Sequence, residues 1–251
     1  MLTMKPPENA YKKQTKILKE IVQRKGRATD LFGIEHLVVM VLCAWLMLMP
    51  AMFVRWYWGR KGYFSRKIAV EVYAIAKPAV LGGLLLWARS YPLLSIAVAV
   101  FFLLDLYSYL LGLVLLRTFY TKPASATRSL VMLGVNFVES VLAFAVLFGA
   151  TSSVAPAGTQ VADLTSGALI YFSLVTAATV GYGDLVPIGP AGRFITIVEI
   201  ASSLAFISVF VSSFVGNLGT RSGGETKSHP GNEAAQQGVA PDDRPRTAAR
   251  G

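Results

Sequence analysis

The residues best suited to chemistry in this sequence are five consecutive ones, Thr179-Val180-Gly181-Tyr182-Gly183. Gly181 and Gly183 can adopt positive φ without the steric cost of a Cβ atom. If these peptide units alternate between right- and left-handed conformations, their carbonyl oxygens point to one axis, and the Thr179 hydroxyl adds an oxygen below them. Val180 and Tyr182 are then expected to pack behind the strand. The pattern therefore predicts a row of oxygens that replaces the hydration shell of an ion.

A single chain provides one such strand and cannot encircle an ion. Closing a ring requires copies related by rotation, so this interpretation predicts a cyclic homotetramer. The alternative interpretation of the same residues is a glycine-rich turn, which is common in ordinary loops. The surrounding sequence has to decide between the two.

The composition is that of a membrane protein. Of 251 residues, 54% are hydrophobic and 15% are charged, against roughly 25% charged in a soluble domain. Crossing a bilayer takes ~20 apolar residues. We expect an all-α membrane protein with segments near Ile68–Ala88, Tyr91–Leu116, Leu130–Ala150 and Phe194–Val215, and a less certain one at Ile34–Val54. No disulfide, metal or catalytic role is expected of the isolated residues His36, Cys43 and His229.

The basic residues predict the topology. The net charge of +10 is concentrated at the ends of the apolar segments, which favours contact with lipid headgroups and no role in binding nucleic acid. If the filter enters from outside, the basic stretches 55–67 and 117–128 are cytoplasmic. A spanning 34–54 segment would then put the very basic N-terminus outside. We favour a re-entrant or interfacial 34–54 segment with both termini cytoplasmic; five spans with an external N-terminus is the alternative.

Three further segments complete the organisation. Residues 8–30 resemble a basic amphipathic helix lying on an anionic inner leaflet, with a partner-binding arm as the alternative. After a turn-rich loop at 151–163, Leu164–Ala178 is too short to span and suits a half-helix capped by Asp163 or Thr165, whose C-terminal dipole favours a cation. A half-helix at membrane depth requires protein or a water-filled cavity around it.

Residues 129–218 resemble the pore of bacterial two-helix-type potassium channels, in which the carbonyl oxygens of a TVGYG strand provide selectivity. The resemblance implies a pore domain (129–218, with the filter at 179–183). Composition and charge predict the other three parts: a basic segment (1–33), auxiliary membrane segments (34–128) and a disordered cytoplasmic tail (219–251). The pore domain is expected to run as outer helix, pore helix, filter and inner helix. The resemblance implies that the permeant ion is K⁺, held at Thr179, Val180, Gly181 and Tyr182, and no cofactor is expected.

The resemblance also assigns positions around the filter. Tyr171 and Phe172 match the aromatic cuff, and Asp184 matches the acidic residue of the outer mouth. Val175 replaces a glutamate found behind the filter of some members, Ala178 replaces a common threonine, and Ser203, next to Ser202, replaces the hinge glycine. Counting along the inner helix places five residues toward the cavity: Leu204, Ile207, Val211, Ser212 and Val215.

Several acidic and basic residues fall inside apolar segments. We expect Glu139 and Glu199 to be functional candidates, with a buried hydrogen-bonded strut behind the filter as the favoured role of Glu199. Glu71 and Lys77 are six residues apart, so any pairing of Lys77 is expected with another helix, and Asp105 lies in the next segment. No segment has arginines at three-residue spacing, so no intrinsic voltage sensor is predicted.

The function that follows is passive, potassium-selective conduction across the cell membrane by a multi-pass homotetramer. A weakly selective cation channel is the first alternative, because Val175 and Ala178 alter the support of the filter. A non-conducting regulatory subunit that retains the pore fold is the second. No nucleophile–base constellation indicates an enzyme.

Overall fold

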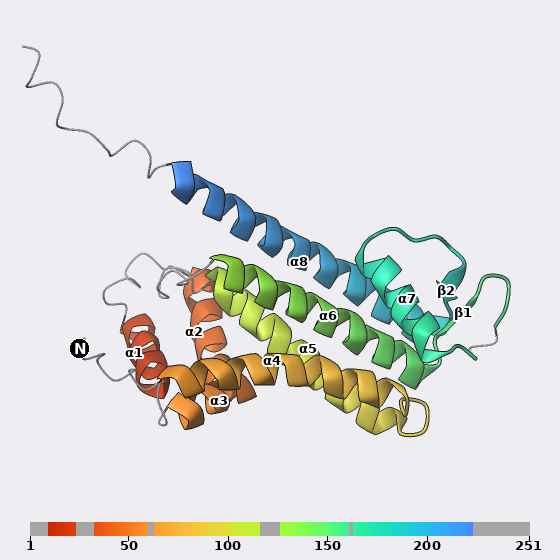
Figure 1. The fold of residues 1–251 in the computed structure, drawn as a ribbon, viewed down its shortest axis with the longest axis horizontal. Helices are drawn as coiled ribbons and strands as arrows, with labels where there is room; N and C mark the ends of the chain where they lie inside the picture. The colour runs from red at the N-terminus through yellow and green to blue at the C-terminus, as the bar shows by residue number, and fades with distance from the viewer. Residues whose placement is uncertain (1–9, 24–32, 60–62, 116–125, 161–162, 223–251) are drawn as a thin grey trace, which may run out of the picture. The chain divides into compact units, whose positions relative to one another are not determined.

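The computed structural model describes residues 10–23, 33–59, 63–115, 126–160 and 163–222. The elements are α1 (Ala10–Val22), α2 (Gly33–Leu48), α3 (Pro50–Gly59), α4 (Tyr63–Leu85), α5 (Pro92–Leu115), α6 (Ala126–Thr151), β1 (Val154–Pro156), α7 (Ser166–Ala177), β2 (Leu185–Pro187) and α8 (Gly189–Ser222) (Figure 1). The chain divides into two compact units, 1–211 and 212–251, and of the second only the last turns of α8 are described.

Four helices are long and apolar enough to cross a membrane. They contain the stretches Ile68–Leu85, Pro92–Gly112, Leu130–Thr151 and Gly189–Val209. These coincide with the four predicted spans, and the short helix α7 coincides with the predicted half-helix. The expected all-α membrane fold, with an outer helix, a short pore helix and an inner helix in that order, is confirmed.

The 34–54 segment is broken into two helices. α2 ends at Leu48, and α3 begins at Pro50. Proline disfavours helical geometry in the residue before it, here Met49, which explains the break. The 16 residues of α2 extend about 24 Å, which is less than the ~30 Å hydrocarbon core. This segment is therefore not a straight span, and the side on which the N-terminus lies stays a prediction.

The predicted amphipathic N-terminal helix exists as α1, but its apolar face lies on protein. Ile17 and Ile21 are buried against Val39 and Cys43 of α2. Lys12, Lys16 and Lys19, spaced at i, i+4 and i+7, stay exposed. A lipid surface would thus meet the lysine side of α1 and not its apolar side, which sequence periodicity alone could not reveal. The basic residues around Arg24 and Lys122 and the tail beyond Ser222 lie outside the described residues.

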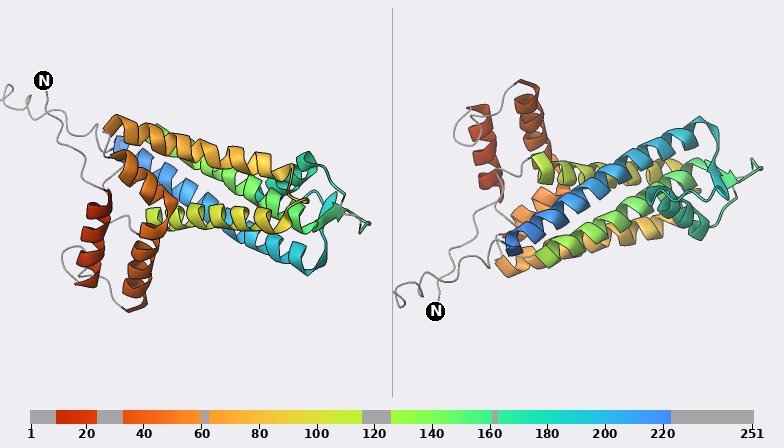
Figure 2. Two further views of the ribbon diagram at one scale, coloured as in Figure 1. Left: turned by 90° about the horizontal axis from the view of Figure 1, so that it is seen from below. Right: turned by 90° about the horizontal axis from the view of Figure 1, so that it is seen from above.

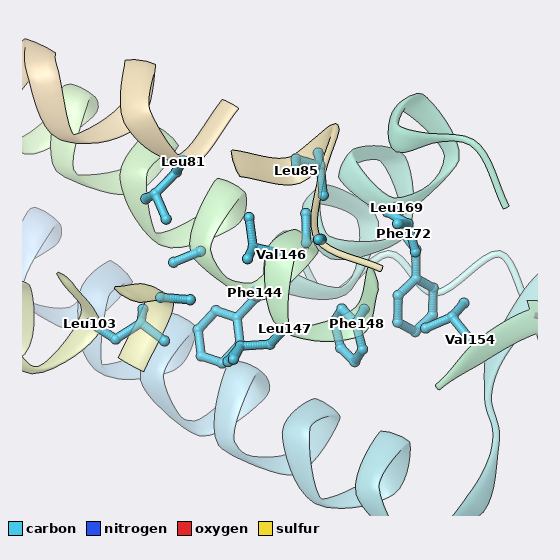
Figure 3. Close-up of a cluster of buried hydrophobic side chains, with 14 residues drawn as sticks. Leu81, Leu85, Leu103, Phe144, Val146, Leu147, Phe148, Val154, Leu169 and Phe172 are labelled. Carbon is cyan, nitrogen blue, oxygen red and sulfur yellow. The ribbon is translucent and has the colours of Figure 1, made fainter. Parts of the chain in front are cut away.

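The largest hydrophobic core joins the auxiliary helices to the pore helix. Leu81 and Leu85 of α4 and Leu103 of α5 pack with Phe144 and Phe148 of α6, as Figure 3 shows. β1 and α7 add Val154, Leu169 and Phe172. Figure 2 shows α4, α5 and α6 running side by side, and α6 also contacts α7. α6 therefore connects the auxiliary bundle with the element that leads into the 179–183 strand.

The inner helix α8 packs along one narrow stripe only. Gly192, Glu199, Ser203 and Phe206 are buried, while Phe194 and Ile197 are 68% and 66% exposed. Such a large apolar surface on a helix is not stable in water and requires lipid or other protein chains around it.

Candidate ion-conduction site

The short helix α7 is fixed at its N-terminus by a side-chain cap. The Thr165 hydroxyl accepts a hydrogen bond from the Ala168 backbone N–H at 3.3 Å. Of the two predicted caps, Thr165 is the one used. The cap satisfies one of the N–H groups that a helix leaves unpaired at its start. This holds the pore helix in place at one end, and the strand 179–183 begins at the other.

The C-terminal end of α7 closes with a paired turn. The N–H of Thr179 donates to the Thr176 carbonyl at 3.0 Å, and the N–H of Val180 donates to the Val175 carbonyl at 3.0 Å. This is the Schellman arrangement, which requires a left-handed residue at the position of Thr179. Thr179 has φ +57°, a conformation that costs a β-branched residue of order 1–3 kcal/mol. The surrounding structure therefore holds Thr179 in a strained conformation.

Positive φ then recurs at every second residue of the strand. After Thr179, Gly181 has φ +59° and Gly183 has φ +79°. The two glycines behave as predicted, whereas the sequence did not predict the left-handed conformation of Thr179. When left- and right-handed residues alternate, the carbonyl groups of successive peptide units point to the same side of the strand. A row of carbonyl oxygens facing one axis requires this arrangement. All five residues of the strand are exposed in the single chain.

A small antiparallel sheet secures the chain after the strand. β1 pairs with β2 in the register Val154↔Pro187, Ala155↔Val186 and Pro156↔Leu185. The Ala157 N–H donates to the Asp184 carbonyl at 2.9 Å, and the Ile188 N–H donates to the Ser153 carbonyl at 2.8 Å. The sequence predicts only a turn-rich loop at 151–163. Three-residue strands lack a periodic signal, which is why this pairing is visible only in the structure.

Three polar or aromatic side chains meet beside the strand. The rings of Tyr171 and Tyr182 are parallel, with centroids 6.5 Å apart. The Tyr171 hydroxyl also donates a hydrogen bond to the Asp184 carboxylate. Tyr182 turns toward the pore helix, as expected, yet it is 71% exposed, and Val180 is 52% exposed. One chain therefore covers the back of the strand only in part.

Phe172 and Val175, the other two residues expected behind the filter, contact different surroundings. Phe172 points into the core, where its ring makes an edge contact with Phe148 at 5.0 Å. Its role within one chain is to fix α7 on α6. Val175 is half-buried and supports the strand through its backbone carbonyl, which accepts from Val180.

A buried hydrogen-bonded chain joins all three elements of the pore module. The Ser173 hydroxyl of α7 lies 2.9 Å from the Val141 carbonyl of α6 and 2.5 Å from Glu199 Oε1 of α8. Glu199 and Ser173 are fully buried. Glu199 is thus buried and hydrogen-bonded as expected, and its role as a strut behind the filter stays a prediction. The sequence analysis did not identify Ser173, although a serine in an apolar half-helix is a usable signal.

The inner helix is continuous through the predicted hinge. The Ser202 hydroxyl donates to the Glu199 carbonyl at 2.9 Å, and Ser203 is buried. Leu204, Ile207 and Val211 share one exposed face, with 52%, 42% and 52% of each residue accessible. Ser212 and Val215 continue α8, but their side chains lie outside the described set. Lining of a cavity by these residues stays a prediction.

A second buried polar group lies between α4, α5 and α6. Lys77 Nζ donates to Asp105 Oδ2 at 3.0 Å and lies 2.9 Å from Glu139 Oε1. As expected, Lys77 pairs with other helices and not with Glu71. The sequence did not predict that Asp105 and Glu139 would share the same lysine, because the three residues come from three separate segments.

Comparison with known proteins matches part of the chain. Residues 136–218 match the sequence model of a family described as "Ion channel". No curated protein and no solved structure matches the chain. The match covers α7, the 179–183 strand and α8, and it begins within α6. Together with the four membrane-length helices, it supports a membrane ion channel.

Proposed function

We propose that this chain forms a homotetrameric channel that conducts potassium ions passively through the filter Thr179–Gly183. The observation that carries the proposal is the backbone of this strand. Residues 179, 181 and 183 have positive φ, directly after the C-terminal end of a half-helix whose dipole favours a cation. The carbonyl oxygens, with the Thr179 hydroxyl, are the groups that replace the hydration shell of K⁺.

Exposure within the single chain supports an assembly of copies. The filter strand is exposed although its backbone is strained at Thr179. The Leu204–Val211 face of α8 is exposed although it is largely apolar. A fourfold arrangement closes the ring of oxygens around an axis and turns the Leu204–Val211 face toward the central cavity. Asp184 then lies at the outer mouth, where its charge attracts cations.

The lysine side of α1 is suited to anionic lipid headgroups. Lys12, Lys16 and Lys19 are exposed on one side, and each lysine near an anionic surface contributes about 1 kcal/mol. Replacing all three with glutamine is expected to reduce the anionic phospholipid that copurifies with the protein. Unchanged lipid retention would contradict this contact.

Reconstitution in liposomes tests the proposed function. The reversal potential in opposing potassium and sodium solutions is expected to follow the potassium gradient, and barium is expected to block the current. Equal permeability to both ions would favour the weakly selective cation channel, for which Val175 and Ala178 are the supporting residues. Absence of any flux from a tetramer of confirmed mass would favour a non-conducting regulatory subunit.

A further inference from the structure

The buried group formed by Lys77, Asp105 and Glu139 is not needed to build the filter. One residue comes from each of α4, α5 and α6, and the three are 6%, 3% and 0% exposed. Charged side chains inside a membrane segment are expensive and mark a function by default. The net charge of these three side chains determines whether the group binds a proton.

The charges of the three residues do not balance when all are ionised. One ammonium faces two carboxylates, which leaves a net charge of −1 in a buried region. Binding one proton makes the group neutral. A buried ion without compensation costs several kcal/mol, so the neutral state is strongly favoured.

The hydrogen bonds indicate which carboxylate holds the proton. Asp105 Oδ2 accepts from Lys77 Nζ and from the Tyr73 hydroxyl, each at 3.0 Å. Glu139 Oε1 is near Lys77 Nζ at 2.9 Å without hydrogen-bond geometry, and Glu139 Oε2 has no hydrogen-bond partner in the described structure. Lys77 is close to both carboxylates, but Asp105 accepts from two donors, so the ionised form is stabilised more at Asp105 than at Glu139.

Other titratable groups around Glu139 do not supply the missing positive charge. α4 contributes Tyr73 and Lys77, and α5 contributes Asp105 and Tyr107. Tyr107 also interacts electrostatically with Glu199 of α8. In the described part of the chain, α7 directs no titratable side chain at Glu139. Among these described groups, Lys77 is the single cation.

A small cavity lies beside this group. It has a volume of about 60 Å³ and its lining includes Val54 of α3, Tyr73 and Lys77 of α4, Asp105 of α5 and Asn136 of α6. One water molecule needs about 10–15 Å³ of such volume, and the polar side chains that line the cavity can bind it. Glu139 does not line the cavity, but Lys77 does, and its Nζ is 2.9 Å from Glu139 Oε1, so the path for a proton between the cavity and the glutamate is short.

We propose that Lys77, Asp105 and Glu139 form a proton-binding site in which Glu139 takes up and releases one proton through this cavity, and that its occupancy regulates the pore through α6. The connection is short. Ser140, the next residue, bonds Tyr107 at 2.9 Å, and the Val141 carbonyl accepts from Ser173 of the pore helix. Loss of the proton leaves an unpaired charge in α6, which favours a rearranged, hydrated state.

The substitution Glu139→Gln distinguishes a proton-binding site from a purely structural ion pair, because the glutamine side chain resembles the neutral carboxyl group of a protonated glutamate. Infrared spectra of the protein in lipid nanodiscs are expected to contain the carbonyl band of a buried neutral carboxylic acid. This band should weaken as pH rises, and the pH-dependent change should be smaller in E139Q than in the wild type. The control variants are E199Q, which reports the other buried glutamate, and E71Q on the exposed side of α4. An unaltered band in E139Q would overturn the proposal.

Thermal unfolding provides a readout independent of conduction. Because folding favours the protonated Glu139, stability of the wild type should fall as pH rises through the titration of the site. E139Q should unfold at the wild-type temperature at neutral pH and lack this dependence. A marked loss of stability in E139Q at neutral pH, or failure to fold, would show an ionised structural pair and overturn the proposal.

Regulation of the pore rests on the proposed channel function, whereas proton binding does not. Potassium flux is expected to depend on pH in the wild type and in E71Q, and to be independent of pH in E139Q. If the spectra and the unfolding behave as expected but the potassium flux is equal at every pH, the regulatory step alone would be overturned. No flux at any pH would contradict the channel function and leave the proton site established by the spectra.

Discussion

The 179–183 strand and the Lys77–Asp105–Glu139 group are two polar regions of the described chain, and they differ in what completes them. The strand is exposed throughout in one chain, with Tyr182 71% accessible. The charged group is buried, and all its partners come from the same chain. In the proposed assembly the first region is completed by neighbouring copies, while the second finds its partners within one chain.

The two regions also differ in the kind of unfavourable feature that each contains. In the 179–183 strand, Thr179 holds a backbone conformation that threonine disfavours, and a hydrogen-bonded helix end enforces it. In the charged group the unfavourable feature is an unbalanced side-chain charge. Backbone strain fixes one geometry, whereas a titratable charge allows two states. A fixed backbone geometry suits the proposed conduction path. A group with two charge states suits the proposed regulation.

The largest effect is expected from Gly181→Ala in the filter. Gly181 has φ +59°, and although no atom lies near an added Cβ in the single chain, alanine is strained there by its backbone conformation. Potassium flux into liposomes should be abolished. Gly82→Ala is the matched control, because Gly82 lies within helix α4 and has open space around it. Unchanged flux in G181A would show that the 179–183 strand is not the filter.

The next largest effect is expected from Lys77→Met in the charged group. Removing the ammonium leaves Asp105 buried without its cation, which should cost about 3–5 kcal/mol of stability. The unfolding temperature in detergent measures this loss, and adding Asp105→Asn should recover part of it. Arg89→Gln is the control, since the Arg89–Asp163 pair at 2.6 Å is largely exposed and should contribute about 0–1 kcal/mol. Equal effects of the two variants would contradict the contrast between a buried and an exposed pair.

Sequence and structure agree best where the signal is local. The TVGYG run, the short apolar stretch before it and the long apolar segments are each contiguous, so the strand, α7 and the four spans were predictable. The partners of Lys77 were not, because Asp105 and Glu139 belong to two other helices and no periodicity relates separate helices. The covering of α1 by α2 and the β1–β2 pairing escaped prediction for the same reason.

A moderate effect is expected from Ser173→Ala, which removes the link between α6, α7 and α8. The Val141 carbonyl and the Glu199 carboxyl lose a common buried partner, which should cost about 1–3 kcal/mol. A double-mutant cycle with Glu199→Gln should give a coupling of about 0.5–3 kcal/mol. Ser208→Ala is the control, because that exposed hydroxyl bonds only the Leu204 carbonyl of its own helix in the contacts observed. Strict additivity of S173A and E199Q would disprove the link.

The smallest effect is expected from Thr165→Ala at the start of the pore helix. This change removes the side-chain acceptor of the Ala168 N–H and should cost about 1 kcal/mol. The neighbouring Ser166→Ala, inside the first turn, should change stability much less, since the cap is formed by Thr165 alone in the described helix end. Because the Schellman turn at the opposite end of α7 stays intact, T165A should leave the potassium-to-sodium permeability ratio unchanged while lowering the unfolding temperature. A change in selectivity without a change in stability would mean that the N-terminal end of α7, and not its C-terminal end, sets the filter geometry.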